Sequence, residues 1–199
     1  VDGDGDLDLF VGGRTVPARY PDPADSRLFL NDEGGFKIDE SNTKVFEKFG
    51  LVTGAVFGDL DQDGDTDLVV ALEWGPVKVM RNDAGKFTDV TQEWGLDIYK
   101  GWWNSVALGD LDGDGSLDIV AGNWGRNSKY EYSYSFKEPL RITYSDFDGN
   151  GVLDIVEYHR DKFTGALVPE RGRSCSTRAM PFIGQRNESF NVFGERSLE

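Results

Sequence analysis

An acidic nine-residue pattern occurs several times in this chain and constrains its fold more than any other feature. Residues 59–67 read DLDQDGDTD, with aspartates at positions 1, 3, 5 and 9 of the pattern and a glycine at position 6. Residues 110–118 (DLDGDGSLD) and 146–154 (DFDGNGVLD) repeat it, with Asn150 in place of one carboxylate. Glycine enters positive φ without a Cβ clash, so position 6 suits a sharp bend. The repetition indicates built loops rather than chance acidic runs.

An oxygen at every second residue is the donor set that Ca²⁺ requires, because this hard cation takes six to eight oxygen ligands at about 2.3–2.6 Å. Position 7 is expected to contribute its backbone carbonyl. The chain opens on VDGDGDLD, which aligns Val1 with Leu60 and lacks the first aspartate, so we expect a cut first loop and a start that is not the natural one. The predicted ligands, for about three to four Ca²⁺ ions, are Asp2, Asp4, Asp6, Asp8, Asp59, Asp61, Asp63, Asp65, Asp67, Asp110, Asp112, Asp114, Ser116, Asp118, Asp146, Asp148, Asn150, Val152 and Asp154.

Short β-rich segments flank each loop. They are predicted strands, at residues 52–58, 105–109 and 140–145 before the loops and at residues 7–11, 67–72, 118–121 and 154–156 after them. These flanks lack helical periodicity, and position 12 of the second loop is Val70 rather than the bidentate glutamate of an EF-hand. The loops therefore join strands, and the aspartate at position 9 is expected to close each site.

A second pattern accompanies the loops. Residues 28–39 (LFLNDEGGFKID) and 79–89 (VMRNDAGKFTD) each run into Asn-Asp, turn through glycine and restart at an aromatic residue, which predicts a β-hairpin. Together with the strand–loop–strand unit this gives four antiparallel strands per repeat. The loop glycines at 5, 64, 115 and 151 recur at intervals of 59, 51 and 36 residues. Four-stranded repeats of this period are typical of propeller blades.

The units GDLDQDGDTDLVVA and GDLDGDGSLDIVAGN, with RNDAGKFTDVTQEWGL between them, resemble the FG-GAP or VCBS repeats of integrin-α-like β-propellers. Residues 101–128 and the tail from Ser174 are similar to bacterial secreted VCBS-repeat proteins related to the cartilage-acidic-protein group. The resemblance implies a propeller of about seven blades, with Ca²⁺ between the first two strands of each blade. A shortened third repeat without a clear hairpin departs from the pattern.

The expected fold is all-β, a partial arc of about three to four four-stranded antiparallel blades with short helices near the C-terminus. We divide it into a truncated blade at 1–48, blades at 49–97 and 98–139, and a blade plus helical tail at 140–199, all in one propeller domain. Pro181 prevents one continuous helix, which favours two short helices or turns. Such an arc cannot close a ring, so the remaining blades are expected from missing chain or from partner copies.

Composition excludes some functions. The formal net charge is −15, much of it in the loops, which argues against nucleic acid because phosphate binding depends on Lys and Arg. No apolar run approaches the length of a membrane span. The single cysteine, Cys175, is interpreted as a small buried thiol, and the single histidine, His159, as structural or surface-exposed.

Five tryptophans raise the question of carbohydrate stacking. Trp102, Trp103 and Trp124 are the candidate ligand-contacting residues, because neighbouring strand residues face opposite sides and one of the adjacent pair can be exposed. The alternative is that they fill space between blades as large hydrophobic side chains.

The leading functional hypothesis is an extracellular Ca²⁺-binding propeller module for adhesion, for carbohydrate or protein binding, or for surface assembly. Its partners would be a polysaccharide or an extracellular protein, and its location extracellular or on the cell surface, with the periplasm as the other possibility. The alternative is a polysaccharide lyase or hydrolase on a Ca²⁺-stabilised propeller, which requires Lys, Arg, Tyr or His converging in a cleft. No catalytic residue and no cofactor other than Ca²⁺ is predicted.

Overall fold

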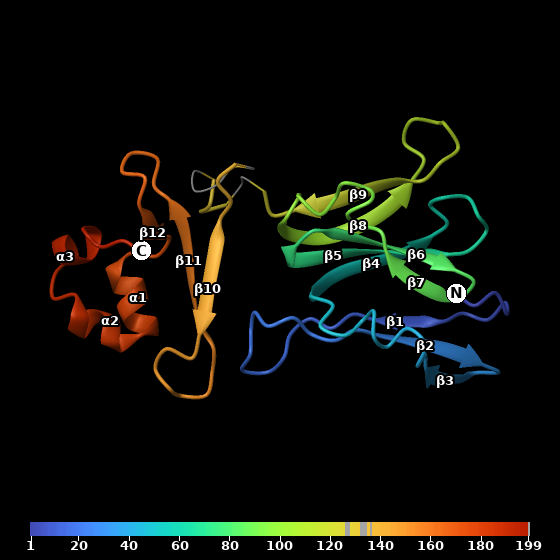
Figure 1. Ribbon diagram of the computed structural model, residues 1–199, viewed down its shortest axis with the longest axis horizontal. Helices are drawn as coiled ribbons and strands as arrows, with labels where there is room; N and C mark the ends of the chain where they lie inside the picture. Colours follow the sequence, from blue (N-terminus) through green and yellow to red (C-terminus); the bar gives the residue numbers. More distant parts are fainter. Residues whose placement is uncertain (126–127, 132–134, 136, 199) are drawn as a thin grey trace. The chain divides into compact units, whose positions relative to one another are not determined.

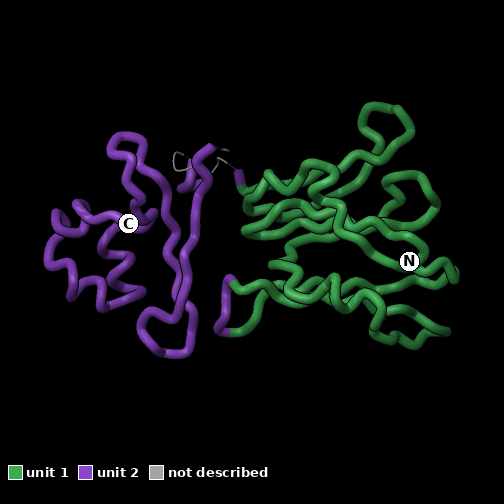
Figure 2. The backbone as a smooth tube through the Cα atoms, in the orientation of Figure 1, with its two compact units in different colours: residues 1–17, 22–124 green, residues 18–21, 125–199 purple. Residues whose placement is uncertain are grey.

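The regular structure of the chain is mainly antiparallel β-sheet joined by turns and loops, with three short helices near the C-terminus, in a computed structural model that describes residues 1–125, 128–131, 135 and 137–198 (Figure 1). This confirms the predicted all-β, propeller-like class. The residues divide into two compact units, one of residues 1–17 and 22–124 and one of residues 18–21 and 125–199 (Figure 2). The blade boundaries set from the sequence stay a prediction. Among the described residues, no helix is both long and apolar enough to cross a membrane.

Unit 1 contains nine strands in two sheets. Its first sheet has the order β1-β2-β3, and its second has the order β7-β6-β5-β8-β9, with β4 also paired to β5. The strands are β1 (Leu9–Val11), β2 (Arg27–Asp32), β3 (Gly35–Ile38), β4 (Leu51–Gly58), β5 (Asp67–Gly75), β6 (Val77–Asp83), β7 (Lys86–Asp89), β8 (Gly101–Gly109) and β9 (Asp118–Asn123). Thus β4 to β7 form one complete four-stranded meander, as expected for a blade.

The strands predicted on either side of the loops are present, and so are both hairpins. In the β2–β3 hairpin the turn residues Glu33 and Gly34 have φ of 52° and 87°, and in the β6–β7 hairpin Ala84 and Gly85 have φ of 50° and 85°. Positive φ at both central residues is typical of a two-residue turn whose twist matches that of the strands. The repeated sequence pattern thus corresponds to a repeated turn geometry.

Strand β5 is buried on both faces and organises the core of unit 1. Leu68, Val69 and Val70 are fully buried. Because alternate residues of a strand point to opposite faces, β5 contributes to two separate core clusters. The first consists of Leu28, Phe46, Phe49, Val52, Leu68, Val70, Leu72, Met80 and Phe87, and the second of Leu60, Val69, Val77, Val79 and Val90. Its continuous apolar run is the sequence signature of a strand covered on both sides.

The first strands of neighbouring repeats, β4 and β8, approach each other closely. The Thr53 hydroxyl donates to the backbone carbonyl of Trp103 at 2.6 Å and to that of Ala71 at 3.0 Å. A Cβ atom added at Gly54 would lie 3.2 Å from the Cα atom of Ser105, so the close approach leaves little room for a side chain there. This contact ties the second repeat of unit 1 to the third.

Unit 2 contains a three-stranded sheet and the helical tail. The sheet has the order β10-β11-β12, and the elements are β10 (Arg141–Ser145), β11 (Asp154–Arg160), β12 (Leu167–Pro169), α1 (Arg173–Ala179), α2 (Pro181–Arg186) and α3 (Phe190–Gly194). Pro181 occupies the start of α2, where a missing N–H is tolerated. The tail thus holds three helices rather than two.

The expectation of a buried thiol is wrong. Cys175 lies on α1 and is exposed, whereas the next residue, Ser176, is the buried one. The Ser176 hydroxyl donates to the backbone carbonyl of Arg171 at 3.0 Å, which satisfies this polar group on the inner face of the helix. A helix this short buries only part of its surface, and composition alone does not determine which part.

A buried carboxylate holds several segments of unit 2 together. The side chain of Glu157 on β11 is 3% exposed and accepts from the Tyr130 hydroxyl, from Lys129 Nζ at 3.2 Å and from Arg171 Nε at 3.1 Å. Burial raises the pKa of Glu157, but these three donors outweigh it and hold that pKa below its usual value. Burial and the neighbouring Glu157 raise the pKa of the Tyr130 hydroxyl, which therefore stays protonated as a donor.

Glu157→Gln is expected to lower the free energy of unfolding at pH 7 by about 1–3 kcal/mol, because it removes a buried charge acceptor from three donors. Since the folded-state pKa lies below the usual value near 4.5, this contribution is present above pH 4.5 and is lost as the pH falls through the folded-state pKa. Urea unfolding of both chains at pH 7 and below pH 4 measures it. A difference that stays constant with pH would contradict the ion-pair assignment.

Candidate metal centres

Three groups of aspartates bring carboxylate oxygens within 4.8 Å of one another. Each group combines positions 1, 3 and 9 of a loop, and the trios are Asp59, Asp61 and Asp67; Asp110, Asp112 and Asp118; and Asp146, Asp148 and Asp154. The first two trios belong to unit 1 and the third to unit 2. In each, position 9 begins the strand that follows the loop, so the closing carboxylate is fixed by a sheet. Each trio could hold a metal ion.

The loops share one internal hydrogen-bond pattern, in which side chains at odd positions accept from the backbone two residues on. In the third loop, the N–H of Asp114 donates to Asp112 at 3.1 Å, and the N–H of Ser116 donates to Asp114 at 2.7 Å. The N–H of position 6 donates to the carboxylate of position 1 at 3.1, 3.0 and 2.9 Å in the second, third and fourth loops. The backbone thus supplies partial positive charge to the crowded carboxylates.

The same backbone twist occurs in all four loops. Position 6 is always a glycine with positive φ, between 87° at Gly151 and 96° at Gly64. Position 4 also has positive φ, and it is a glycine in every loop except the second, where Gln62 has φ 64°. An L-residue is less favourable than glycine in this region of φ. The sequence pattern did not predict this second bend, because the second loop, which has the most complete set of aspartates, carries Gln62 rather than glycine at position 4.

Asp67 links the second loop to the hairpin of its own repeat. Its side chain is buried and accepts from the N–H of Leu60 at 2.9 Å and from the N–H of Asn82 at 2.8 Å. Burial raises the pKa of Asp67, the negative charges of Asp61 and Asp63 raise it further, and the two N–H groups act in the opposite direction. Without a bound cation, the charged form of the Asp67 carboxylate is therefore disfavoured both by burial and by the nearby negative charges of Asp61 and Asp63.

Asn82 links three backbone segments around the second loop, a role that the sequence did not indicate. Its side chain is fully buried; it accepts from the N–H of Gly85 at 2.8 Å and donates to the carbonyls of Thr66 at 3.1 Å and Val1 at 2.9 Å. It therefore connects the hairpin turn, the second loop and the first loop. The repeated Asn-Asp pair is the sequence signal for this residue, but the pattern by itself predicts only a turn.

The first loop follows the same plan without its position 1. Asp8 accepts from the N–H of Asn31 at 2.9 Å, just as Asp67 accepts from Asn82, and it also accepts from the amino group of Val1. Burial raises the pKa of Asp8, but these donors outweigh it and lower that pKa below its usual value. Asp4 and Asp6 keep the internal hydrogen bond of positions 5 and 7, at 2.8 Å.

One carboxylate oxygen of the Asp59, Asp61 and Asp67 trio accepts no hydrogen bond from the described residues. Asp59 Oδ1 is buried and has no hydrogen-bond partner among the described residues. Buried carboxylate oxygens are normally paired, because leaving one without a partner is costly. All side-chain donors in the three trios are carboxylate oxygens, which suits a hard cation and not a metal that prefers His or Cys. The residues present therefore fit a bound Ca²⁺ ion.

Positions 5 and 7 stay predicted ligands. At position 5, Asp63, Asp114 and Asn150 each accept from the N–H of position 7, at 2.8, 2.7 and 2.8 Å. At position 7, the Asp65 carboxylate accepts from the N–H of Ala84 at 2.7 Å, so this side chain braces the loop against the β6–β7 hairpin. That leaves the backbone carbonyl of position 7 as the predicted ligand.

Two of the three candidate tryptophans come together, at the end of the sheet opposite the loops of unit 1. The rings of Trp102 and Trp124 stack with centroids 4.2 Å apart, and Trp74 meets Trp102 edge-on at 5.3 Å. Trp124 is 47% exposed. Trp103 instead packs against the second core cluster, and its indole N–H donates to the carbonyl of Tyr99 at 2.9 Å. Their role as ligand contacts stays a prediction.

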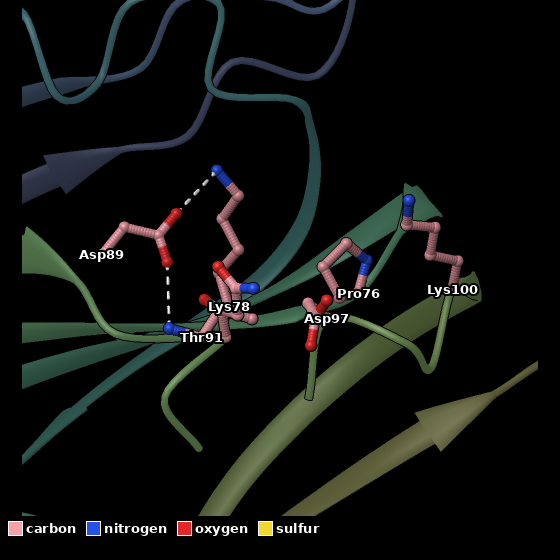
Figure 3. Close-up of a pocket in the computed structure, with 7 residues that line it drawn as sticks. Pro76, Lys78, Asp89, Thr91, Asp97 and Lys100 are labelled. Atoms are coloured by element: carbon pink, nitrogen blue, oxygen red, sulfur yellow. Dashed lines mark hydrogen bonds and ion pairs between the residues drawn. The ribbon is translucent and has the colours of Figure 1, made fainter. Parts of the chain in front are cut away.

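A small pocket of about 290 Å³ lies at the far end of β5 from the Asp59–Asp67 loop (Figure 3). Its lining residues are Pro76, Lys78, Asp89, Thr91, Gln92, Asp97 and Lys100. Lys78 Nζ lies 3.2 Å from Asp89 and 4.4 Å from the centroid of the Phe49 ring. Burial raises the pKa of Asp89, but the Thr91 and Lys78 donors lower it below its usual value. This ion pair joins β6 to β7 at the end of the hairpin away from its turn.

The groups that the enzyme hypothesis requires do gather in unit 2, but around the chain's own carboxylates. Tyr130, Lys129 and Arg171 all contact Glu157. His159 Nδ1 lies 2.6 Å from Glu170 Oε1, and the Glu170 side chain is 8% exposed. These contacts tie β11 to the segments beside it.

Asn82→Ala is expected to lower the free energy of unfolding by about 2–4 kcal/mol, because it removes three hydrogen bonds of a buried side chain and leaves one part-buried N–H and two part-buried carbonyls without these partners. The matched control is Asn31→Ala in the first hairpin, where the side chain accepts from the N–H of Gly34 at 3.0 Å and is only half-buried. That variant is expected to lose about 1 kcal/mol. Urea unfolding measures both, and equal losses would contradict the linking role of Asn82.

Comparison with known proteins places the chain in a family. The FG-GAP-like repeat model matches residues 1–70 and again residues 59–121. Cartilage acidic protein 1 of Xenopus tropicalis is 28% identical in an alignment 120 residues long, and the match covers 51% of this chain and 18% of that protein. The chain thus spans about a fifth of the length of this relative. The matched residues include the first three loops, both hairpins and the strands that carry the unit 1 trios, and the chain belongs to the FG-GAP-like repeat family.

Proposed function

We propose that this chain is a Ca²⁺-binding part of an extracellular FG-GAP-repeat protein that serves adhesion or the binding of partners. The observation that carries the proposal is the trio of carboxylates at positions 1, 3 and 9, which recurs with oxygens within 4.8 Å in three loops. The buried Asp59 Oδ1, without a protein donor, adds an acceptor that a cation would satisfy. Membership of the repeat family supports an extracellular binding or adhesion module.

Ca²⁺ is favoured over other common cations by the chemistry of the donors. Zn²⁺ sites use mainly Cys and His, and the one cysteine and one histidine lie outside the trios. Mg²⁺ demands a near-ideal octahedron and keeps several waters, whereas Ca²⁺ accepts irregular sets of six to eight oxygens. Each trio would supply three side chains, with position 5 and the carbonyl of position 7 as further ligands. A bound ion would supply the positive charge that offsets repulsion among these carboxylates.

The proposal extends to location and partners. Extracellular Ca²⁺ is millimolar, a concentration that fills even weak oxygen sites. We place the protein outside the cell or on its surface, with further blades from the rest of a longer chain or from partner copies. The partner class is a polysaccharide or an extracellular protein. For the polysaccharide class, the stacked Trp102–Trp124 pair is the candidate contact, because one of its rings is about half exposed.

Ca²⁺ is expected to raise the melting temperature of the chain relative to EGTA. Binding to the native state alone stabilises by about 2.7 kcal/mol per site at a hundredfold excess over Kd, or about 5–10 °C for a chain of this size. Asp61→Ala and Asp112→Ala should each remove one site's share of the rise. Scanning calorimetry over a Ca²⁺ series measures this.

The matched control is Glu93→Ala, which removes an exposed acidic side chain outside the loops. It should leave the Ca²⁺-dependent rise unchanged. A rise that is absent, or that Glu93→Ala reduces as much as Asp61→Ala does, would contradict specific binding at the loops. Mg²⁺ at the same concentration should give a smaller rise.

A glycan array with Ca²⁺ present tests the partner class. Trp124→Ala should weaken binding of any retained glycan by about three- to tenfold, in line with an aromatic stacking contribution of about 0.5–1.5 kcal/mol. Trp94→Ala is the control, since Trp94 is 42% exposed and stands outside the stacked cluster. No retention of any glycan would remove the polysaccharide class and leave the extracellular protein.

A further inference from the structure

A glutamine side chain connects the second metal loop to the third. Gln62 occupies position 4 of the second loop, between Asp61 and Asp63. Its amide Nε2 donates to the carbonyl of Gly115 at 3.2 Å and to the hydroxyl of Ser116 at 3.1 Å. Gly115 and Ser116 are positions 6 and 7 of the third loop. The two loops are therefore joined by a side chain that belongs to one and bonds the other.

The Gln62 contact joins segments that position carboxylates in both loops. In the second loop, Gln62 directly follows a member of the trio. In the third loop, the N–H of Gly115 donates to Asp110 at 3.0 Å, and the N–H of Ser116 donates to Asp114 at 2.7 Å. The bonded segment thus also positions carboxylates of the third loop. A change of backbone position on one side is transmitted to ligand side chains on the other.

The link is particular to this pair of loops. The equivalent position 4 is Gly3, Gly113 or Gly149 in the other loops, and glycine has no side chain to reach a neighbour. Gln62 takes the positive φ that glycine adopts more readily, at φ 64°, so the second loop keeps the common geometry despite its side chain. Its amide therefore reaches the third loop without altering the loop that carries it.

We infer that Gln62 is a positioning residue that couples the two metal sites of unit 1, so that an ion in the Asp110–Asp118 loop strengthens binding in the Asp59–Asp67 loop, and the reverse. The inference rests on the proposed Ca²⁺ binding. An ion held by one loop orders that loop, and the Gln62 amide then orders the other before its ion binds, which reduces the entropy that the second event must lose. Coupling of this kind is reciprocal.

The test follows each loop separately in the whole chain by NMR. The amides of Gly64 and Gly115 donate to position 1 of their own loops, so each cross-peak reports occupancy of one site. Ca²⁺ is titrated into the chain and into Asp112→Ala, which disables the third loop. The Ca²⁺ concentration that half-saturates Gly64 should rise about threefold in Asp112→Ala, a modest coupling because the connecting bonds are exposed.

The same pair of titrations is repeated with Gln62→Met, which keeps a side chain of similar length at positive φ and removes the amide. In this background Asp112→Ala should leave the Gly64 titration unchanged, which separates the amide link from through-space electrostatic effects of Asp112. Glu33→Met is the matched control, because Glu33 is also exposed with positive φ, but in the β2–β3 hairpin turn. It should keep the threefold effect.

The outcomes separate the two proposals. In one outcome the cross-peaks move with Ca²⁺, but Asp112→Ala shifts the Gly64 titration equally with and without Gln62→Met. That result would overturn the coupling and leave Ca²⁺ binding intact. Cross-peaks of Gly64 and Gly115 that do not respond to millimolar Ca²⁺ would overturn the proposed function itself. Loss of the threefold effect in Gln62→Met but not in Glu33→Met supports the link.

Discussion

Repulsion among closely held carboxylates is the constraint on which the rest of this structure depends. Two unit charges about 4 Å apart repel by roughly 1–4 kcal/mol between the limits of water and a partly shielded protein surface. Three carboxylates within 4.8 Å, in three loops, would separate unless something held them. The loops meet this with backbone N–H groups, as where the N–H of Gly151, followed by those of Asn150 and Gly149, lowers the pKa of Asp146. A bound Ca²⁺ ion, as proposed, would further reduce the repulsion among these carboxylates.

The closing aspartate shows how the loop and the hairpin of a repeat depend on each other. Asp67 accepts one N–H from its own loop and one from Asn82 in the hairpin, and Asp8 repeats this with Asn31. Each hairpin therefore supplies a donor to the closing carboxylate of the acidic loop that precedes it in the same repeat. This gives a physical reason for the two sequence patterns to occur in order, since neither element alone pairs both oxygens of the closing carboxylate.

Burial of β5 on both faces sets how the repeats of unit 1 associate. One face packs with Phe46 and Leu28 of the preceding repeat, and the other belongs to the cluster that Trp103 and Val106 of the following repeat cover. The acidic loops before β5 and β9 are thereby brought near each other, and the Gln62 side chain bridges them. Packing between repeats thus determines which loops can influence each other.

The sequence by itself determined the local features: the ligand pattern, the strands on either side of each loop and the two-residue hairpin turns. These depend on residues within a few positions of one another, through glycine at positive φ and the alternation of side chains along a strand. Only the tertiary structure decided the partners of Asn82 and Gln62, the stacking of Trp102 on Trp124 and the exposure of Cys175. Asn82 and Val1 are 81 residues apart, and Gln62 and Ser116 are 54 apart. Contacts over such separations depend on how whole strands pack, which no local pattern encodes.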